Sequence, residues 1–319
     1  MKKGVALILW LTGSVACWCQ SERWTLAFWN VENFFDTKHD TLKEDFAFTP
    51  EGDNHWTKSR YEDKRDKIYK MIAAMRYPDV VGLSEVENDY VLRDLCRYTP
   101  LRRYHYEFVH YESPDRRGSD CALIYRKHRL KVLESRAICV SDSSKGFQTR
   151  DILLVGGVLL QGLRRDSCYI LVNHWPSKLG GAVAERRRVE IAQKLRFLLD
   201  SLWVAHPSAL VLAMGDFNSD PYESPMDNMG FGKDGRNAEG FINLMYGLKR
   251  GGGSYKYKDS WSYIDQVIAN RDLKVEASSP DFILLDDERN MGKKVFRTYV
   301  GMRYLGGFSD HLPLIIEVP

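Results

Sequence analysis

Two short polar runs, each next to an apolar stretch, contain residue types that could do chemistry. Gly215–Asn218 (GDFN) follows the apolar run Ala209–Met214, and Ser309–His311 (SDH) precedes Leu312–Ile316. Each run combines a carboxylate with an amide or an imidazole. Such groups can hold a hard divalent cation and move a proton at a phosphate. Either run alone is a weak signal, because Asp and Asn also open ordinary turns.

Polar residues also stand at the ends of several other strand-like segments. Together with the two runs they form one set: Asn30, Glu85, His174, Asp216, Asn218, Asp265, Asp310 and His311. Packed strands would bring such ends to one rim, so we expect these side chains to share a site. Each residue alone could equally be a turn, cap or surface residue. A structural role would have to be assumed independently for each of these residues, whereas one shared site accounts for all of them. We therefore favour the shared site.

Hydrolysis of a phosphodiester needs a cation to neutralise charge, an activated water and help for the leaving oxygen. Asn30, Glu85 and Asp310 offer oxygen ligands for Mg²⁺, which usually has few protein ligands. His311 could be the general base, oriented by a carboxylate such as Asp265. These residue types therefore point to metal-assisted phosphoester hydrolysis.

Other members of the set could complete the reaction. Asp216 and Asn218 could align the attacking water and the phosphate. His174 could donate a hydrogen bond to the phosphoryl oxygens. Which histidine takes the proton stays open at this point.

The segments that must position these side chains are mostly strand-like. Apolar runs bounded by polar residues predict strands at 24–30, 79–86, 121–125, 152–160, 168–173, 210–214, 264–268 and 312–318. The spacing of apolar residues predicts helices over 60–75, 89–98 and 184–203. Strands outnumber helices without strict alternation, which favours two sheets packed face to face with helices outside. The polar segments 36–58, 220–260 and 284–307 are expected to be irregular loops around the site.

The first 19 residues differ from the rest of the chain. Lys2 and Lys3 precede an apolar run over 4–15, and the small residues Cys17 and Cys19 stand near the expected cleavage point, which is typical of a secretory signal peptide. The run is too short for a comfortable membrane span. We therefore expect a signal peptide over 1–19, one domain over 20–319, and export to the periplasm or the cell exterior. Lipid anchoring at Cys17 is the alternative.

The charge of the mature chain gives no overall electrostatic argument for nucleic-acid binding. Removing residues 1–19 takes away two lysines and no acidic residue, so the formal charge falls from +3 to +1.

Four cysteines then remain, namely Cys96, Cys121, Cys139 and Cys168. None belongs to a Cys-x-x-Cys pair, which argues against a zinc site. The apolar, strand-like surroundings of Cys121, Cys139 and Cys168 favour free thiols in the core.

Taken together, the motifs resemble the endonuclease/exonuclease/phosphatase superfamily, which includes DNase I-like nucleases and inositol-phosphate and sphingomyelin phosphodiesterases. The matching segments span nearly the whole mature chain: 29–33 (WNVEN), 82–86 (GLSEV), 117–125 (RGSDCALIY), 173–178 (NHWPSK), 215–219 (GDFNS), 264–267 (IDQV) and 309–313 (SDHLP). The runs 215–219 and 309–313 are the most specific. Thr149–Asp151 also looks similar to the family, without a role that we can assign.

The resemblance implies a DNase I-like fold, a four-layer α/β/β/α sandwich of two mostly antiparallel sheets flanked by helices. It also implies dependence on Mg²⁺ or Mn²⁺ and direct attack by water, without a covalent enzyme intermediate. Asn30, Glu85 and Asp310 would hold the metal.

The resemblance assigns the remaining roles as well. His311 and His174 would share acid and base work, and Asp216 with Asn218 would position water and phosphate. Asp265 stands where the family keeps the aspartate that partners a histidine. The list of catalytic residues that it implies is His174, Asp216, Asn218, Asp265, His311 and Tyr125, with Tyr125 as an active-site tyrosine.

The core motifs do not name the substrate, because the family covers DNA, RNA, lipids and small phosphoesters. Basic and aromatic residues cluster over 102–106 and 249–258, which would suit nucleic acid, although solvated loop charges explain them as well. The loop 251–258 is rich in glycine and lysine, whereas a secreted lipid phosphodiesterase would be expected to show an apolar hairpin.

We therefore expect a monomeric exported nuclease that cleaves DNA or RNA. A phospholipid or small-molecule phosphodiesterase or phosphatase is the alternative. A non-enzymatic exported binding module is disfavoured by the intact set of carboxylates, amides and imidazoles.

Overall fold

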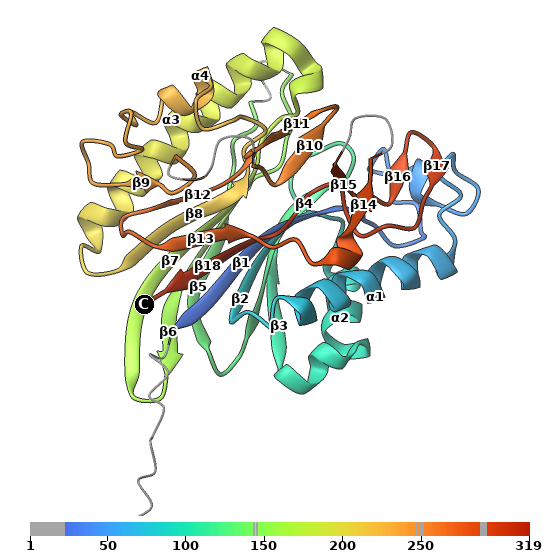
Figure 1. The fold of residues 1–319 in the computed structure, drawn as a ribbon, viewed down its shortest axis with the longest axis horizontal. Helices are drawn as coiled ribbons and strands as arrows, with labels where there is room; N and C mark the ends of the chain where they lie inside the picture. Colours follow the sequence, from blue (N-terminus) through green and yellow to red (C-terminus); the bar gives the residue numbers. More distant parts are fainter. Residues whose placement is uncertain (1–22, 143, 145, 247, 249–251, 288–291) are drawn as a thin grey trace, which may run out of the picture.

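Two six-stranded sheets pack face to face, and helices cover both outer faces (Figure 1). The computed structural model describes residues 23–319 apart from 143, 145, 247, 249–251 and 288–291. The layers run α/β/β/α, so the predicted α+β fold with two mostly antiparallel sheets is confirmed. The predicted signal peptide over 1–19, Cys17 included, lies outside the described residues.

The first sheet joins strands that are far apart in the sequence, in the order β13–β18–β1–β2–β4–β3. Its strands are β1 (Trp24–Phe34), β2 (Val80–Val86), β3 (Tyr106–His110), β4 (Asp120–Arg126), β13 (Lys274–Ala277) and β18 (Leu314–Val318). β1 and β2 pair in parallel, whereas the other neighbours pair antiparallel. The parallel pair brings the C-terminal ends of β1 and β2 to the same edge.

The second sheet repeats this arrangement in the order β5–β6–β7–β8–β12–β9. Its strands are β5 (Leu130–Ile138), β6 (Ile152–Gln161), β7 (Arg164–His174), β8 (Leu210–Asp216), β9 (Ile242–Asn243) and β12 (Asp265–Ala269). β7 and β8 form the parallel pair, and the other neighbours pair antiparallel. The C-terminal ends of β7 and β8 therefore also meet at one edge.

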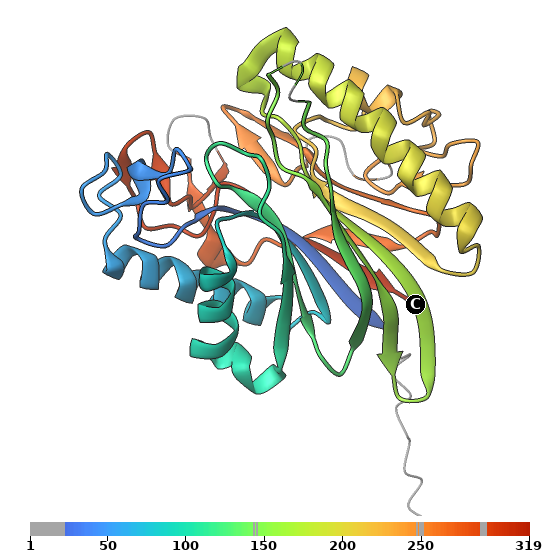
Figure 2. The ribbon, with the colours of Figure 1, turned by 180° about the vertical axis from the view of Figure 1, so that it is seen from behind.

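Helices α1 (Lys58–Ala74) and α2 (Asp89–Tyr98) cover the first sheet, and α3 (Gly181–Ala205) and the short α4 (Ser224–Asp227) cover the second (Figure 2). The predicted helices over 60–75, 89–98 and 184–203 match α1, α2 and α3. Polar caps start the first two: the Thr57 hydroxyl accepts from the Arg60 amide, and the Asn88 side chain accepts from the Val91 amide.

Three apolar layers hold the sandwich together. One lies between the sheets, where Phe28 of β1 and Leu212 of β8 belong to the same fully buried cluster. Outer layers join each sheet to its helices, with Ile68 of α1 under the first sheet and Leu195 of α3 under the second. Gly82 of β2 allows the sheets to approach closely, because an added Cβ would lie 2.6 Å from a Met214 side-chain carbon.

Several segments that we expected to be irregular contain short strands and single helical turns. They are β10 (Tyr255–Tyr257), β11 (Ser260–Ser262), β14 (Leu284–Asp286), β15 (Lys293–Val295), β16 (Tyr299–Val300), β17 (Arg303–Tyr304) and η1 (Phe46–Phe48). Three more helical turns lie outside those segments: η2 (Pro100–Tyr104), η4 (Lys178–Gly180) and η5 (Asp281–Ile283). The prediction of loops over 36–58, 220–260 and 284–307 was thus wrong in part. Strands of two or three residues are too short to show a recognisable apolar period.

The cysteines also differ in part from expectation. Cys121 and Cys168 are free and buried, as predicted, whereas Cys139, which was also expected in the core, is exposed just after β5; Cys96 is free and buried as well. In the part of the chain that the structure describes, no helix combines the length and the apolarity that crossing a membrane requires.

Candidate active site

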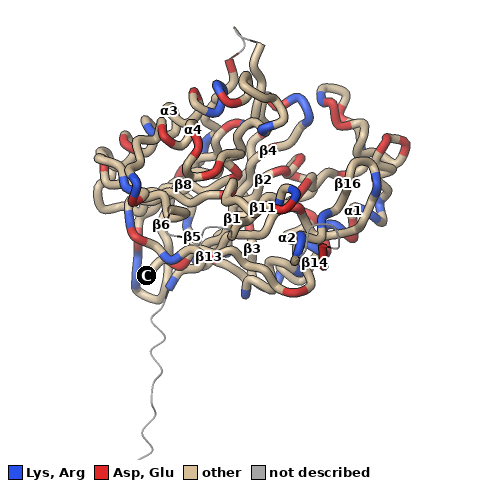
Figure 3. The backbone as a smooth tube through the Cα atoms, turned by 45° about the horizontal axis from the view of Figure 1, so that its top comes forward, with Lys and Arg blue, Asp and Glu red and all other residues tan. Residues whose placement is uncertain are grey.

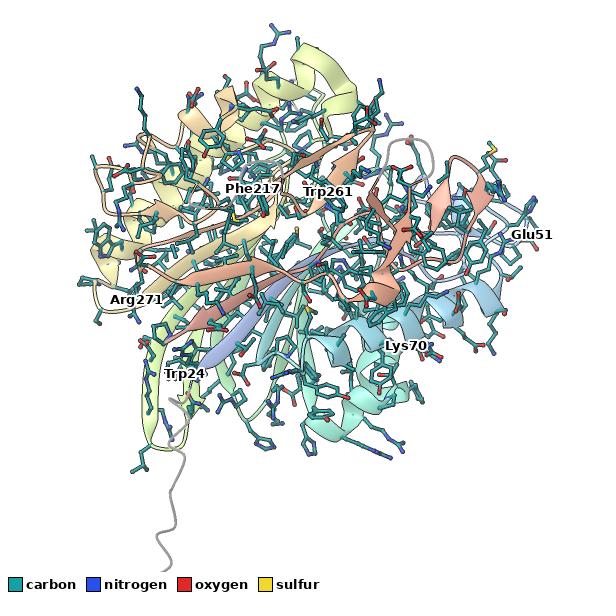
Figure 4. All side chains as sticks on the ribbon, in the orientation of Figure 1. Trp24, Glu51, Lys70, Phe217, Trp261 and Arg271 are labelled. Carbon is teal, nitrogen blue, oxygen red and sulfur yellow. The ribbon has the colours of Figure 1, made fainter. Side chains whose placement is uncertain are left out.

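The strand ends bring the predicted polar residues to one rim of the sandwich. In the first sheet, Asn30 of β1 pairs with Ser84, next to Glu85. In the second, Asp216 of β8 pairs with His174 on one side and with Asp265 on the other. We call the following residues the strand-end cluster: Asn30, Glu85, His174, Asp216, Asn218, Asp265, Asp310 and His311. In Figure 4, Phe217, next to Asp216, marks this end of the molecule, and Trp24 marks the opposite end.

The backbone is unusual where the cluster forms. The pairing of β2 with β4 is irregular between Ser84 and Val86, and Glu85 between them has a φ of 64°. Asn218 also adopts the left-handed region, with a φ of 47°. Such conformations are uncommon for residues with a side chain and concentrate at functional sites. The irregularity turns the Glu85 carboxylate toward the neighbouring strand end.

Asn30 links two carboxylates that belong to different sheets. Its Nδ2 lies 3.2 Å from Glu85 Oε1 and 3.1 Å from Asp216 Oδ2, and donates to both. Its Oδ1 accepts from the Glu32 amide at 2.9 Å. Asn30 therefore orients the two carboxylates through its nitrogen, while its oxygen keeps a second lone pair, and its role as a metal ligand stays a prediction.

His311 is held by Asp265 inside the protein. The His311 Nδ1 lies 2.7 Å from Asp265 Oδ2, and both residues are at least 95% buried. The other ring nitrogen, Nε2, faces Asp310 Oδ1 at 3.8 Å and Asp216 Oδ2 at 3.9 Å. Burial alone would lower the pKa of His311, but Asp265, Asp310 and Asp216 raise it well above its ordinary value. A carboxylate that fixes one nitrogen leaves the other free to move a proton.

His174 has the opposite electrostatic setting. Its Nε2 lies 3.6 Å from Asp216 Oδ2 and 3.3 Å from Nη2 of Arg150, which can donate to it. Burial, followed by the positive charges of Arg150 and Arg117, holds the pKa of His174 well below its ordinary value. His174 is therefore neutral and is paired with an arginine at the rim.

The carboxylates of the cluster are not equivalent. Burial would raise the pKa of Glu85, but the positive charges of Arg117, Arg150 and His311 hold it below its ordinary value. Burial raises the pKa of Asp216 to about 7. The Asn218 amide donates to Asp216 Oδ1 at 2.9 Å. Glu85 is thus a permanent anion, whereas Asp216 is close to its titration point at neutral pH.

The cluster contains groups that could bind a metal ion. The Glu85 and Asp310 side chains are 17% and 18% exposed, so their hard oxygens are open to a cation from solvent. Asp216, Asp265 and His311 also have ligating atoms within 4.8 Å of one another. However, His311 Nδ1 and Asp265 Oδ2 already bond each other at 2.7 Å, which suits a proton-moving pair better than a metal site. Glu85 and Asp310 therefore fit a hard divalent ion best.

A buried network supports the loop that carries Asp310. The Lys64 ammonium of α1 donates to Thr298 Oγ1 at 2.6 Å and to the Phe308 carbonyl at 2.7 Å. The Glu32 carboxylate accepts from the Thr298 amide at 2.6 Å, and Arg297 donates to Asp310 Oδ2 at 2.8 Å. No sequence motif pointed to Lys64, because a lysine in an amphipathic helix is ordinarily solvated.

Tyr125 does not belong to the cluster, which corrects its assignment as an active-site residue. β4 runs antiparallel to β2, so Asp120 pairs with Val86 near the rim and Tyr125 pairs with Val80 at the far end. Five residues along a strand correspond to about 17 Å. The Tyr125 hydroxyl donates to Glu107 at 3.3 Å.

Two arginines that were given no role stand near the cluster instead. Arg150, from the Thr149–Asp151 run, is 93% buried and contacts His174. Arg117 begins the motif that ends in Tyr125, and its charge acts on both Glu85 and His174. The basic run 102–106 lies near Tyr125, at the far end of the first sheet, and does not reach the site.

Comparisons with known proteins agree with this geometry. A family model described as Endonuclease/Exonuclease/phosphatase family matches residues 25–319. A search of curated proteins found no match.

Solved structures share the fold. D. rerio TDP2 complexed with a single-strand DNA product is 19% identical, with a TM-score of 0.57 and coverage of 93% of this chain and 99% of that one. Bacteroides thetaiotaomicron mannosyl-6-phosphatase is 15% identical, with a TM-score of 0.56 and coverage of 93% and 99%. The human nocturnin catalytic domain with bound sulfate is 15% identical, with a TM-score of 0.54 and coverage of 93% and 94%. At these identities the likeness shows the fold alone.

Proposed function

Because the chain belongs to the endonuclease/exonuclease/phosphatase family, we propose that it is a metal-dependent phosphodiester hydrolase, and that its substrate is DNA or RNA. One observation carries the proposal. The buried Asp265–His311 pair and the Asn30-linked carboxylates Glu85 and Asp216 converge on one rim, although they come from both sheets.

Each member of the strand-end cluster has a task in this proposal. Glu85 and Asp310 would hold Mg²⁺ or Mn²⁺, which when bound neutralises charge on the phosphoryl oxygens. Asn30 keeps the Glu85 and Asp216 carboxylates in place. Asp216 lies beside Asn218 and positions the attacking water.

The two histidines have different tasks in this proposal. His311, fixed through Nδ1 by Asp265, moves the proton at Nε2. His174 and Arg150 lie together at the other side of Asp216 and bind the phosphoryl oxygens.

Cations around the rim support an anionic substrate. Arg117 is the most open of them, at 52% exposed. Lys178 and Arg297 are 45% and 38% exposed, and they also pair with Glu223 at 2.6 Å and with Asp310 at 2.8 Å. Over the whole molecule, basic and acidic residues are mixed (Figure 3). The attraction is therefore local to the rim and does not come from net charge.

A small phosphoester is the second candidate substrate, and one observation favours it. The basic run 102–106 lies at the far end of the sheet from the rim, so a long nucleic acid bound at the site would not contact it. A small substrate needs only the local arginines Arg117 and Arg150.

A substrate panel separates these candidates. Mature protein would be incubated with Mg²⁺ and single-stranded DNA, RNA, bis(p-nitrophenyl) phosphate or a sugar phosphomonoester. The proposal expects cleavage of nucleic acid that EDTA abolishes. Cleavage of the sugar phosphomonoester alone would contradict the nuclease proposal and favour a small phosphoester as the substrate. Hydrolysis of none of them would overturn the enzyme assignment.

We also propose that the protein is exported as a monomer. The two lysines and the apolar run at the N-terminus support a signal peptide over 1–19. Mass spectrometry of the protein secreted by its host would give the mature N-terminus. We expect the mature protein to start at residue 20. A mature protein that starts at Cys17 and carries a lipid there would show instead that the protein is membrane-anchored. Size-exclusion chromatography of the mature protein is expected to give the mass of one chain.

A further inference from the structure

A second group of ligating side chains lies outside the strand-end cluster, at the β3–β4 connection. It consists of His110 at the end of β3, Asp120 at the start of β4, and Glu112 just after β3. Their ligating atoms all lie within 4.8 Å of one another. We call this group the β3–β4 cluster. It has no part in the proposed hydrolysis.

Two buried polar atoms face each other in this cluster without a hydrogen bond between them. His110 Nδ1 lies 3.0 Å from Asp89 Oδ1 and donates to it, so Nε2 is the nitrogen that faces Asp120. That nitrogen lies 3.6 Å from Asp120 Oδ2. The His110 and Asp120 side chains are 2% and 0% exposed, and neither of the two facing atoms has a hydrogen-bond partner. Buried polar atoms of this kind normally have a partner, so something is expected between them.

The separation suits a metal ion better than a proton. A charge-assisted hydrogen bond from an imidazolium to a carboxylate would be about 2.7–2.9 Å long. Zinc lies about 2.0–2.2 Å from histidine nitrogen and carboxylate oxygen, so two such ligands at a tetrahedral angle or slightly wider are roughly 3.4–3.6 Å apart. The observed 3.6 Å between His110 Nε2 and Asp120 Oδ2 falls in the zinc range.

The surroundings hold the ligands in position. Asp120 Oδ1 accepts from the amide and the hydroxyl of Ser113, which turns Oδ2 toward His110. Asp89 fixes the tautomer of His110, and a carboxylate behind a histidine is the usual outer partner of a metal ligand. Glu112 is 56% exposed, so an ion can enter from solvent.

The charges also favour a cation. The carboxylates of Asp120, Glu112 and Asp89 all lie close to the His110 imidazole, so the cluster carries more acidic than basic side chains. Lys43 is near, with its Nζ 3.8 Å from Glu112 Oε2, but it donates to the Ser113 and Asp115 carbonyls at 2.8 and 3.1 Å. Its charge is therefore directed at the loop backbone and not between His110 and Asp120.

We propose that His110, Glu112 and Asp120 bind a zinc ion that clips the β3–β4 connection. One imidazole and two carboxylates leave one position for water, and imidazole with carboxylate suits zinc more than magnesium or calcium. The absence of Cys-x-x-Cys pairs argued against zinc, but that argument covers only sites built on cysteine. The sequence does contain the three ligands, as His110-x-Glu112 followed eight residues later by Asp120. This spacing matches no common zinc motif, so the sequence analysis did not identify it.

The clip has a consequence for the proposed active site, although the binding proposal does not rest on it. The connection that it closes carries Asp115 and Arg117. Asp115 Oδ2 lies 3.6 Å from Arg150 Nε, and Arg150 contacts His174. Zinc would thus hold the loop that supports the arginines beside His174.

Metal binding can be measured without any substrate. Mature protein carrying Glu85→Gln and Asp310→Asn, which removes the proposed magnesium ligands, would be stripped with EDTA and titrated with Zn²⁺ and with Co²⁺. One equivalent of zinc is expected to bind, and Co²⁺ is expected to give the visible absorption of a tetrahedral site. Adding Glu112→Gln should weaken binding at least about tenfold, as should Asp89→Asn, and adding His110→Ala should abolish it.

Two controls keep the result decisive. His128→Ala removes an exposed histidine elsewhere and should leave zinc binding unchanged. Glu112→Gln alters a mostly exposed side chain, so it tests the site even where His110→Ala fails to fold. The ¹⁵N resonances of His110 in the zinc-treated protein should show an unprotonated Nε2. Failure to bind zinc, binding that is unaffected by both Glu112→Gln and His110→Ala, or protonation of both His110 nitrogens would each overturn the proposal.

Discussion

The imidazole of His311 and the carboxylate of Asp265 share a 2.7 Å hydrogen bond inside the protein, although 46 residues separate them in the sequence. Asp265 lies on β12 of the second sheet, and His311 precedes β18 of the first. The bond therefore joins the two sheets at the rim where their strands end. It also fixes which nitrogen of His311 faces the rest of the strand-end cluster.

Replacing Asp265 by Asn should uncouple this pair. The neutral amide lacks the negative charge of the carboxylate that accepts the hydrogen bond from His311 Nδ1. His311 therefore loses its electrostatic support and is less firmly oriented. We expect kcat to fall roughly 10²–10⁴-fold, the range of general acid–base catalysis, with a smaller change in KM. Steady-state kinetics on the substrate that the panel identifies would measure this. Asp272→Asn is the matched control, because it makes the same chemical change at an exposed aspartate. Gln266, the neighbour of Asp265, cannot serve as a control, because it is buried and bonded to Ser219.

Tyr125→Phe should leave activity unchanged within about twofold. The hydroxyl bonds to Glu107 and lies at the end of β4 away from the rim. Kinetics of the purified variant under the conditions used for wild type would test this. A loss of more than tenfold with an unchanged melting temperature would return Tyr125 to the site.

Asn30→Ala should lower turnover and weaken the response to metal at the same time. The amide nitrogen bonds to both Glu85 and Asp216, so its removal lets the two carboxylates repel and separate. We expect kcat to fall about 10–100-fold and the Mg²⁺ concentration for half-maximal rate to rise. A metal titration of activity distinguishes this from simple instability. A variant with normal metal dependence would show that Asn30 does not organise the carboxylates.

Stability should depend on pH through Glu87. Burial, with the charges of Asp36, Asp45 and Glu112, raises the pKa of Glu87 to about 8 from an ordinary value of 4.5. Between these values the folded state binds more protons than the unfolded state, so stability falls as pH rises through this window. Glu87→Gln should remove part of that fall, on the order of 2 kcal/mol. Urea denaturation with EDTA at pH 5.5 and pH 8.5 would measure it. The idea fails when wild type and variant show the same pH dependence.

Thiol labelling should separate the cysteines. Burial raises the pKa of both Cys96 and Cys168 to about 12, and Cys121 is equally buried. Cys139 is exposed, so an alkylating reagent at pH 8 should label it alone in the native mature protein. Peptide mass spectrometry before and after denaturation would show this. Early labelling of Cys121 would mean that β4 opens readily.

Much of the fold follows from apolar periodicity, and the reasons for the misses are physical. Strands such as β8, whose residues are all buried, are read directly from their apolar run. Edge strands such as β5 and β13 are partly exposed and carry a mixed pattern, and strands as short as β16 carry no pattern at all. Such segments become strands because they pair with a neighbouring strand, and that neighbour is often distant in the sequence.

The site divides in the same way. Asp216 and Asp310 could be found because a polar residue directly after or before an apolar run is visible in the sequence. Tyr125 was misplaced because its motif reaches the rim at one end only, through Asp120 and Arg117. Arg150 could be seen but not interpreted, since its role depends on its distance to His174. Lys64 gave no signal, because only the tertiary structure buries it.

Metal add-back to the EDTA-treated protein tests the central claim most directly. The hydrolysis of bis(p-nitrophenyl) phosphate would be followed for wild type, Glu85→Gln and Asp310→Asn as Mg²⁺ is restored. We predict no activity without metal, recovery in wild type, and a requirement for at least tenfold more Mg²⁺ in each variant. Full activity in EDTA, or variants with the metal response of wild type, would contradict the account.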